Sequence, residues 1–140
     1  MAELSYRDRV RPEWIDYNGH LSEPYYVLVF GDATTFLMDT AGLGPHLSGS
    51  SLYTVEAHVR YLREVGPDAD LEVTTRVLAA RGKKVRLCHE MRVDGDLVAT
   101  EEILAIHVTG SRASPLPAAA VERLERYLNP VPDYAGRAIA

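Results

Sequence analysis

The chain has 140 residues, of which 46% are hydrophobic and 25% are charged. This composition is typical of one globular domain and unlike that of disordered chains. Its 15 Lys and Arg against 20 Asp and Glu give a formal net charge of -5. Because such a field opposes phosphate backbones and anionic lipid surfaces, we expect neither nucleic acid nor a membrane among the partners.

The cysteine and histidine content limits redox and metal chemistry. Cys88 is the single cysteine, which excludes an internal disulfide and any site of several thiolates within one chain. The histidines show no close-spaced ligand pair, so we expect no metal. The first residues do not resemble a secretory signal, and no apolar run is long enough to span a bilayer. The cytoplasm is the expected location.

Alternating or β-branched segments predict five strands. They cover residues 4–10, 52–64, 71–80, 84–93 and 97–109. The links between the last four are short, which favours antiparallel neighbours. The link Asp94-Gly95 predicts a two-residue hairpin, because both residues tolerate a positive φ.

Two segments predict helices. The first runs from Pro24 to a stop at Gly42, with Ser22 as its N-cap. Its first half is apolar almost all the way round, so we expect other elements to wrap it. The second covers residues 118–128 and ends before Asn129-Pro130.

The order of elements predicts an α+β domain over residues 1–128, followed by a frayed tail over 129–140. A five-stranded antiparallel sheet wrapped around one long central helix, with a short C-terminal helix, would bury an apolar helix. The hot-dog fold meets this description.

The loop before the long helix holds the densest group of polar and aromatic residues, from Trp14 to Glu23. The N–H groups at a helix start stabilise an anion or a developing oxyanion. Asp16 lies just upstream, where it could attack a carbonyl or activate a water. The alternative is structural, because Asp16-Tyr17-Asn18-Gly19 also reads as a tight turn.

Two further residues of the loop have both a catalytic and a structural interpretation. His20 could orient the loop or the acid, or it could simply belong to the turn. The side chain of Glu23 suits the first turn of a helix, and its backbone N–H is the candidate oxyanion donor. The predicted catalytic set is therefore Asp16, Glu23 and His20.

The segment Val10-Arg11-Pro12-Glu13-Trp14-Ile15-Asp16-Tyr17-Asn18-Gly19-His20-Leu21, followed by Tyr25-Tyr26, resembles the signature of hot-dog thioesterases of the hydroxybenzoyl-CoA type. Together with residues 53–65, it looks most like betainyl-CoA thioesterases, which accompany or are fused to carnitine dehydrogenases. The resemblance implies an acyl-CoA thioester hydrolase without a cofactor beyond the coenzyme A of its substrate. It also implies a homodimer joined edge to edge, or a dimer of dimers.

The resemblance assigns roles to two positions. It implies that Asp16 is the nucleophile or general base and that the backbone N–H of Glu23 is an oxyanion donor. Many relatives carry other polar residues where this chain has Ser22 and Glu23. No side-chain role is therefore carried over to those two positions.

A betainyl group carries a quaternary ammonium, which aromatic faces and carboxylates recognise. The hypothesis of an aromatic cage follows, drawn from Trp14, Tyr17, Tyr25, Tyr26, Tyr53 and Tyr61. The alternative is that residues 53–61 alternate to form the core face of a strand. The predicted substrate-binding residues are Trp14, Tyr17, Asn18, Tyr26 and Tyr53.

Two other functions remain open at this stage. One is a thioesterase for an aromatic or medium-chain acyl-CoA, and the other is a non-catalytic module that binds acyl-CoA. The coenzyme phosphates have four candidate partners: Arg81, Lys83, Lys84 and Arg112.

Overall fold

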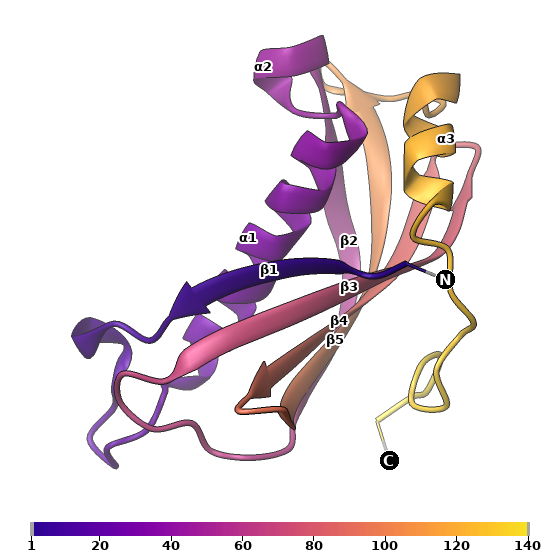
Figure 1. Ribbon diagram of the computed structural model, residues 1–140. Helices are drawn as coiled ribbons and strands as arrows, with labels where there is room; N and C mark the ends of the chain where they lie inside the picture. The colour runs from indigo at the N-terminus through magenta and orange to yellow at the C-terminus, as the bar shows by residue number, and fades with distance from the viewer. Residues whose placement is uncertain (1, 140) are drawn as a thin grey trace.

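The computed structural model describes residues 2–139, in which one antiparallel sheet curls around one side of a long helix (Figure 1). The strands follow the order β1-β3-β4-β5-β2, and β6 pairs with β5. Their bounds are Leu4–Arg9 for β1, Ser50–Tyr61 for β2, Asp70–Arg81 for β3, Lys84–Val93 for β4, Asp96–Thr109 for β5 and Arg112–Ala113 for β6.

The five long strands confirm the predicted ones, with bounds that move by up to three residues. The hairpin between β4 and β5 turns at Asp94 and Gly95, whose φ values are 51° and 84°. The short elements were not predicted from the sequence. They are β6, the 3-10 turn Pro12–Trp14 and the helix α2, Pro45–Ser48.

The long helix α1 covers Glu23–Ala41. Ser22 is its extended N-cap, and Gly42 ends it in the left-handed conformation at φ 77°. The sheet wraps this helix as predicted, but one chain covers it only in part, because Val27, Leu28 and Phe36 are 41%, 46% and 39% exposed. The exposed side of α1 faces away from the sheet, between Val27 near β2 and Phe36, which contacts Tyr6 of β1. Within residues 2–139, no helix is both long and apolar enough to cross a bilayer.

The core forms two clusters along α1. Phe30 packs with Trp14 and Met91 toward the N-terminal half of the helix, whereas Leu37 packs with Leu124 toward its C-terminal half. Leu124 belongs to α3, Ala118–Glu125, which lies beside the upper end of α1 in Figure 1. A curved sheet that holds one central helix, with a short C-terminal helix, is the hot-dog fold expected from the sequence.

A buried histidine links α1 to the sheet. His89 Nε2 lies 2.7 Å from Thr34 Oγ1, and His89 Nδ1 lies 2.7 Å from Thr75 Oγ1. Thr34 also donates to the Phe30 carbonyl, so its oxygen accepts from the Nε2–H, and Nδ1 accepts from Thr75. Burial lowers the pKa of His89 to about 3, so the neutral ring is a fixed connector in the core.

Replacing Thr34 by Val is expected to destabilise the fold by about 1–3 kcal/mol, because the His89 Nε2–H loses its acceptor in the core. Thr35→Val is the matched control. Thr35 also bonds the carbonyl four residues earlier, but it is exposed and does not contact His89. The free energies of unfolding in urea measure the difference, and equal values for the two variants would contradict a linking role for Thr34.

A β-bulge in β2 changes which side chains face the helix. The register against β5 shifts across Val55, so the alternation of faces reverses there. Thr54 before the bulge and Ala57 after it both face α1, where they line the same cavity. Tyr53 therefore points away from α1, at 54% exposure, whereas Tyr61 faces it and contacts Tyr26. The prediction that residues 53–61 form one continuous core face is wrong for this reason.

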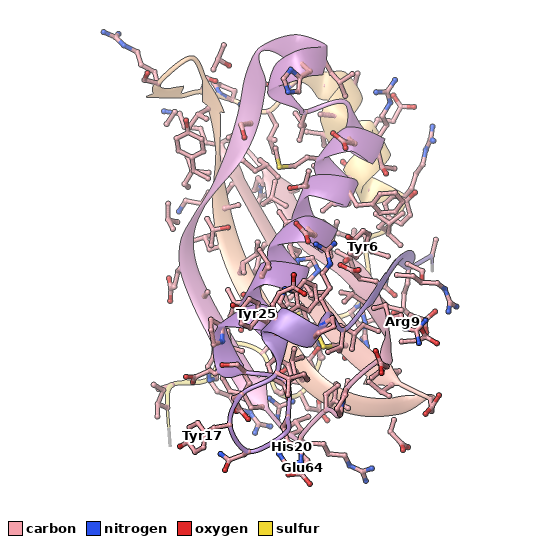
Figure 2. All side chains as sticks on the ribbon, turned by 90° about the vertical axis from the view of Figure 1, so that its left-hand side faces the viewer. Tyr6, Arg9, Tyr17, His20, Tyr25 and Glu64 are labelled. Carbon is pink, nitrogen blue, oxygen red and sulfur yellow. The ribbon has the colours of Figure 1, made fainter. Side chains whose placement is uncertain are left out.

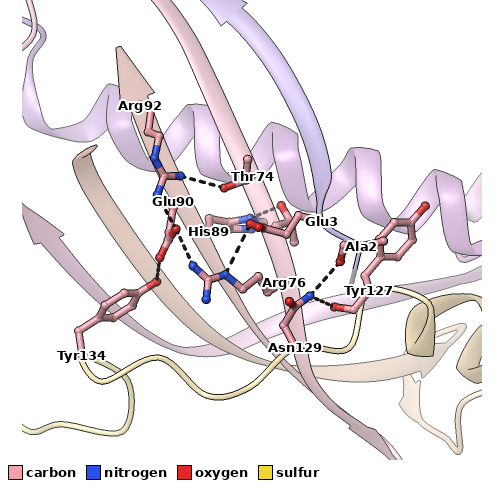
Figure 3. A network of polar contacts seen from close by, with 11 residues as sticks. Ala2, Glu3, Thr74, Arg76, His89, Glu90, Arg92, Tyr127, Asn129 and Tyr134 are labelled. Carbon is pink, nitrogen blue, oxygen red and sulfur yellow. Dashed lines mark hydrogen bonds and ion pairs between the residues drawn. The ribbon is translucent and has the colours of Figure 1, made fainter. Parts of the chain in front are cut away.

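The C-terminal tail lies against the outer face of the sheet instead of being frayed. The Tyr134 hydroxyl donates to a Glu90 carboxylate oxygen at 2.7 Å, as Figure 3 shows. The Arg60 guanidinium stacks over the Tyr134 ring at 4.4 Å. The Gly136 N–H donates to Glu102 at 2.7 Å. Proline and glycine in the tail suggested disorder, but aromatic and polar contacts with the sheet order it.

Candidate active site

Asp16 lies in a tight turn and also presents a carboxylate oxygen to a cavity. Its Oδ1 accepts the backbone N–H groups of Asn18 at 2.9 Å and His20 at 3.3 Å. Gly19 completes the turn at φ 80°. Its Oδ2 has no hydrogen-bond partner within residues 2–139. The structural and the chemical interpretations of this motif are therefore compatible, because one oxygen holds the turn and the other remains available.

The cavity beside Asp16 has a volume of about 430 Å³. Leu21, Glu23 and Tyr26 line it from the loop and the first turn of α1. The opposite wall comes from the end of β2 and the residues after it: Tyr61, Leu62, Arg63 and Glu64. The two walls are tied together by the Tyr26 hydroxyl, which donates to the Arg63 carbonyl at 3.2 Å. The fold therefore brings two segments that are distant in the sequence, residues 16–26 and 61–64, to the two walls of one cavity.

The start of α1 supplies the electrophilic side of this cavity. The N–H of Glu23 lies in the first turn and has no intrahelical acceptor. Pro24 follows and has no N–H, so Glu23 carries the first free donor of the helix. A carbonyl oxygen placed there would meet both this donor and the positive end of the helix dipole. The arrangement can polarise a carbonyl beside the Asp16 carboxylate.

His20 lies at the rim of the cavity. Its Nε2 is 3.4 Å from Glu64 Oε2, and Figure 2 shows the two side chains together at the end of the loop. No contact joins the His20 ring to the Asp16 carboxylate within the described residues, where only the His20 backbone N–H reaches it. In this geometry His20 links the loop before α1 to the segment after β2.

The structure brings two residues of the predicted aromatic cage to the cavity beside Asp16: Tyr26 and Tyr61, whose ring centroids are 5.1 Å apart. Trp14 is buried and stacks on Tyr25 at a centroid distance of 5.6 Å. Tyr17 points into solvent, 96% exposed, at the loop end seen in Figure 2, and Asn18 beside it is also exposed. Tyr53 lies on the other face of the sheet. Of the predicted substrate-binding residues, Tyr26 alone lines the cavity beside Asp16.

The basic candidates for coenzyme binding lie far from Asp16. Arg81, Lys83 and Lys84 are exposed at the turn that joins β3 to β4, and Arg112 is exposed on β6. The loop that holds Asp16 lies at the other end of β3, where Arg9 of β1 and Asp70 of β3 are opposite each other in the sheet. A strand of 12 residues spans about 36 Å at ~3.3 Å per residue, so one chain does not bring these groups together.

Glu101 was not singled out from the sequence. It is 5% exposed on β5, faces α1 and lines a second cavity of about 470 Å³ between α1 and β2. The alternation of Ala99, Glu101 and Ile103 could have placed it on the buried face, since Ala99 and Ile103 are core residues. An acidic residue at a position where the strand pattern predicts a core residue is the signal that could have identified Glu101 from the sequence.

Comparison with known proteins agrees with this geometry. A family described as the thioesterase-like superfamily matches residues 10–124. The betainyl-CoA thioesterase of Pseudomonas aeruginosa is 37% identical over 96% of this chain and 92% of its own length. The L-carnitine dehydrogenase/betainyl-CoA thioesterase of Agrobacterium fabrum is 42% identical over 90% of this chain, which spans 28% of that longer protein.

Solved structures show the same fold. A Pseudomonas putida KT2440 protein assigned to the thioesterases superposes with a TM-score of 0.89 at 34% identity, covering 100% of this chain and 97% of the other. The Staphylococcus aureus protein SAV2348, solved in complex with CoA, gives a TM-score of 0.86 at 22% identity, covering 99% and 95%, and supports the fold alone. The chain therefore belongs to the thioesterase-like superfamily.

Proposed function

We propose that this protein hydrolyses an acyl-CoA thioester and that betainyl-CoA is its substrate. The observation that carries the proposal is the free Asp16 oxygen in a cavity beside the first turn of α1. The betainyl-CoA thioesterase that is 37% identical over most of both chains supports the choice of acyl group.

In the proposed reaction, the thioester carbonyl oxygen binds at the Glu23 N–H. Asp16 then either attacks the carbonyl carbon or removes a proton from an attacking water. By the general-base route, a C–O bond to the attacking water replaces the C–S bond directly. By the nucleophilic route, a C–O bond to Asp16 replaces it, and water then hydrolyses the resulting anhydride and restores the carboxylate. In both routes the thiolate of coenzyme A leaves and takes up a proton. The products are the free acid and coenzyme A, and the reaction consumes one water and no other reactant.

We further propose that the working unit is a homodimer, or a dimer of dimers, in the cytoplasm. The edge of β2 is unpaired within residues 2–139, and Val55 on it is 58% exposed. Val27 and Leu28 on the open side of α1 extend this apolar surface. Pairing two such edges would cover it and would bring the distant basic turn of one subunit toward the catalytic loop of the other.

The test is a thiol-release assay of the purified protein with betainyl-CoA, acetyl-CoA, hydroxybenzoyl-CoA and a medium-chain acyl-CoA. We expect kcat/KM to be highest for betainyl-CoA. Highest turnover of another thioester would retain the thioesterase and overturn the substrate. Absence of turnover of all four by a folded protein would overturn the enzyme and favour a module that only binds acyl-CoA.

A further inference from the structure

The cavity between α1 and β2 has apolar and hydroxyl-bearing walls. Its volume of about 470 Å³ lies within the usual range for small-ligand sites. Val27, Gly31, Thr35 and Met38 line it from α1, and Leu52 and Ala57 line it from β2. Among the lining residues, Glu101 alone carries a formal charge, and no Lys or Arg is present.

The Glu101 carboxylate has no polar partner in the part of the chain that the structure describes. It makes no hydrogen bond or ion pair within residues 2–139, although the residue is only 5% exposed. Its neighbour Glu102 shows the usual alternative, since it binds the Arg86 guanidinium at 2.7 Å on the opposite face of the sheet. A buried carboxylate without a cation is costly, and a bound cation would remove that cost.

The groups around Glu101 do not supply this cation. His89 on β4 pairs with it across the sheet, but burial lowers the His89 pKa to about 3 and keeps the ring neutral. Tyr61 on β2 is nearby, and burial raises its pKa above 10. The lining residues of α1 include no titratable side chain. Burial also raises the pKa of Glu101 itself to about 7.

We propose that this cavity receives the trimethylammonium end of the acyl group and that Glu101 is its counter-ion. The inference rests on the proposed function and makes Glu101 the residue that determines specificity. A quaternary ammonium cannot donate hydrogen bonds, so it requires a negative charge and apolar walls around its methyl groups. The cavity offers both.

The location of the cavity is consistent with this role. It follows the same open side of α1 as the cavity beside Asp16, because Glu23, Val27 and Gly31 recur every four residues along one face of the helix. Tyr61 lines the cavity beside Asp16, and its pKa is raised first by burial and then by the charges of Glu23 and Glu101. One methylene separates the nitrogen of a betainyl group from its carbonyl carbon, so the cation of a thioester bound at the helix start would enter this cavity at its Val27 end, one helical turn from Glu23.

The experiment compares betainyl-CoA with 3,3-dimethylbutyryl-CoA, in which a neutral carbon replaces the nitrogen in the same shape. At pH 8 we expect Glu101→Gln to lower the ratio of the two kcat/KM values by at least about thirtyfold, as for truncation of one partner of a buried charge pair. The matched control is Glu102→Gln, which removes the adjacent carboxylate on the opposite face. An unchanged ratio in Glu101→Gln would overturn the inference.

A binding measurement separates this inference from the proposed function. The dissociation constants of both thioesters are measured by calorimetry with Asp16→Asn, or with the wild-type protein if it shows no turnover. Loss of the preference for betainyl-CoA on further replacing Glu101 by Gln would support the counter-ion even without catalysis. If the protein hydrolyses thioesters but binds betainyl-CoA and 3,3-dimethylbutyryl-CoA equally well, the proposed thioesterase activity would stand and the role of Glu101 as counter-ion would be overturned.

Discussion

Asp16→Asn is expected to lower kcat for thioester hydrolysis by about a thousandfold, with little change in stability. The carboxylate is the proposed base or nucleophile, and such groups contribute ~10²–10⁴ in rate. Asn retains an Oδ1 acceptor, so the hydrogen bonds from the N–H groups of Asn18 and His20 can persist. Thiol release under saturating substrate, together with the melting temperature, measures the two effects separately.

Two controls sharpen this result. Glu64→Gln removes another carboxylate of the same cavity, and with it the ion pair to His20, but leaves Asp16 in place. We expect its kcat to stay within about tenfold of the wild type. Asp16→Ala removes the acceptor as well and should lower both activity and stability, since the turn loses its side-chain bonds. An Asp16→Asn variant with wild-type turnover would show that Asp16 serves the turn alone.

The parts of the fold that depend on local chemistry were predictable from the sequence. Ser22 and Gly42 marked the ends of α1, and Asp94-Gly95 marked a hairpin, because each depends on the conformational preferences of one or two residues. The candidate loop was found in the same way. Asp16 and Glu23 lie in one cavity because only six residues, which form the turn and the helix cap, separate them.

The features that were missed depend on long-range pairing. The bulge at Val55 arises from the register between β2 and β5, which no local pattern encodes, and it moved Tyr53 out of the predicted site. Likewise, Trp14 stacks on Tyr25 because the core, not the ligand site, required its large surface. Exposure of Val27 and Leu28 follows from the limited width of the sheet. Which residues share a site was therefore less predictable than which elements form.

The unpaired carboxylate of Glu101 also has a consequence for stability. A folded-state pKa of about 7 against the ordinary 4.5 means that the folded protein binds this proton more tightly than the unfolded chain. The free energy of unfolding therefore falls as the pH rises from 4.5 through 7, by about 3 kcal/mol for the whole shift. Burial of the carboxylate without a neighbouring cation is the physical cause of this cost.

Glu101→Gln should consequently stabilise the free protein by about 3 kcal/mol at pH 8 and by less than about 1 kcal/mol at pH 5, where the wild-type carboxyl is already neutral. Urea unfolding at the two pH values measures this, and the contribution of His89 cancels because both proteins contain it. Glu102→Gln should destabilise instead, since it breaks the pair with Arg86. A Glu101→Gln variant that is no more stable than wild type at pH 8 would mean that the carboxylate already has a compensating cation. If Glu101→Gln is both more stable and less selective for the cationic thioester, the Glu101 carboxylate destabilises the free protein and the bound cation offsets that destabilisation.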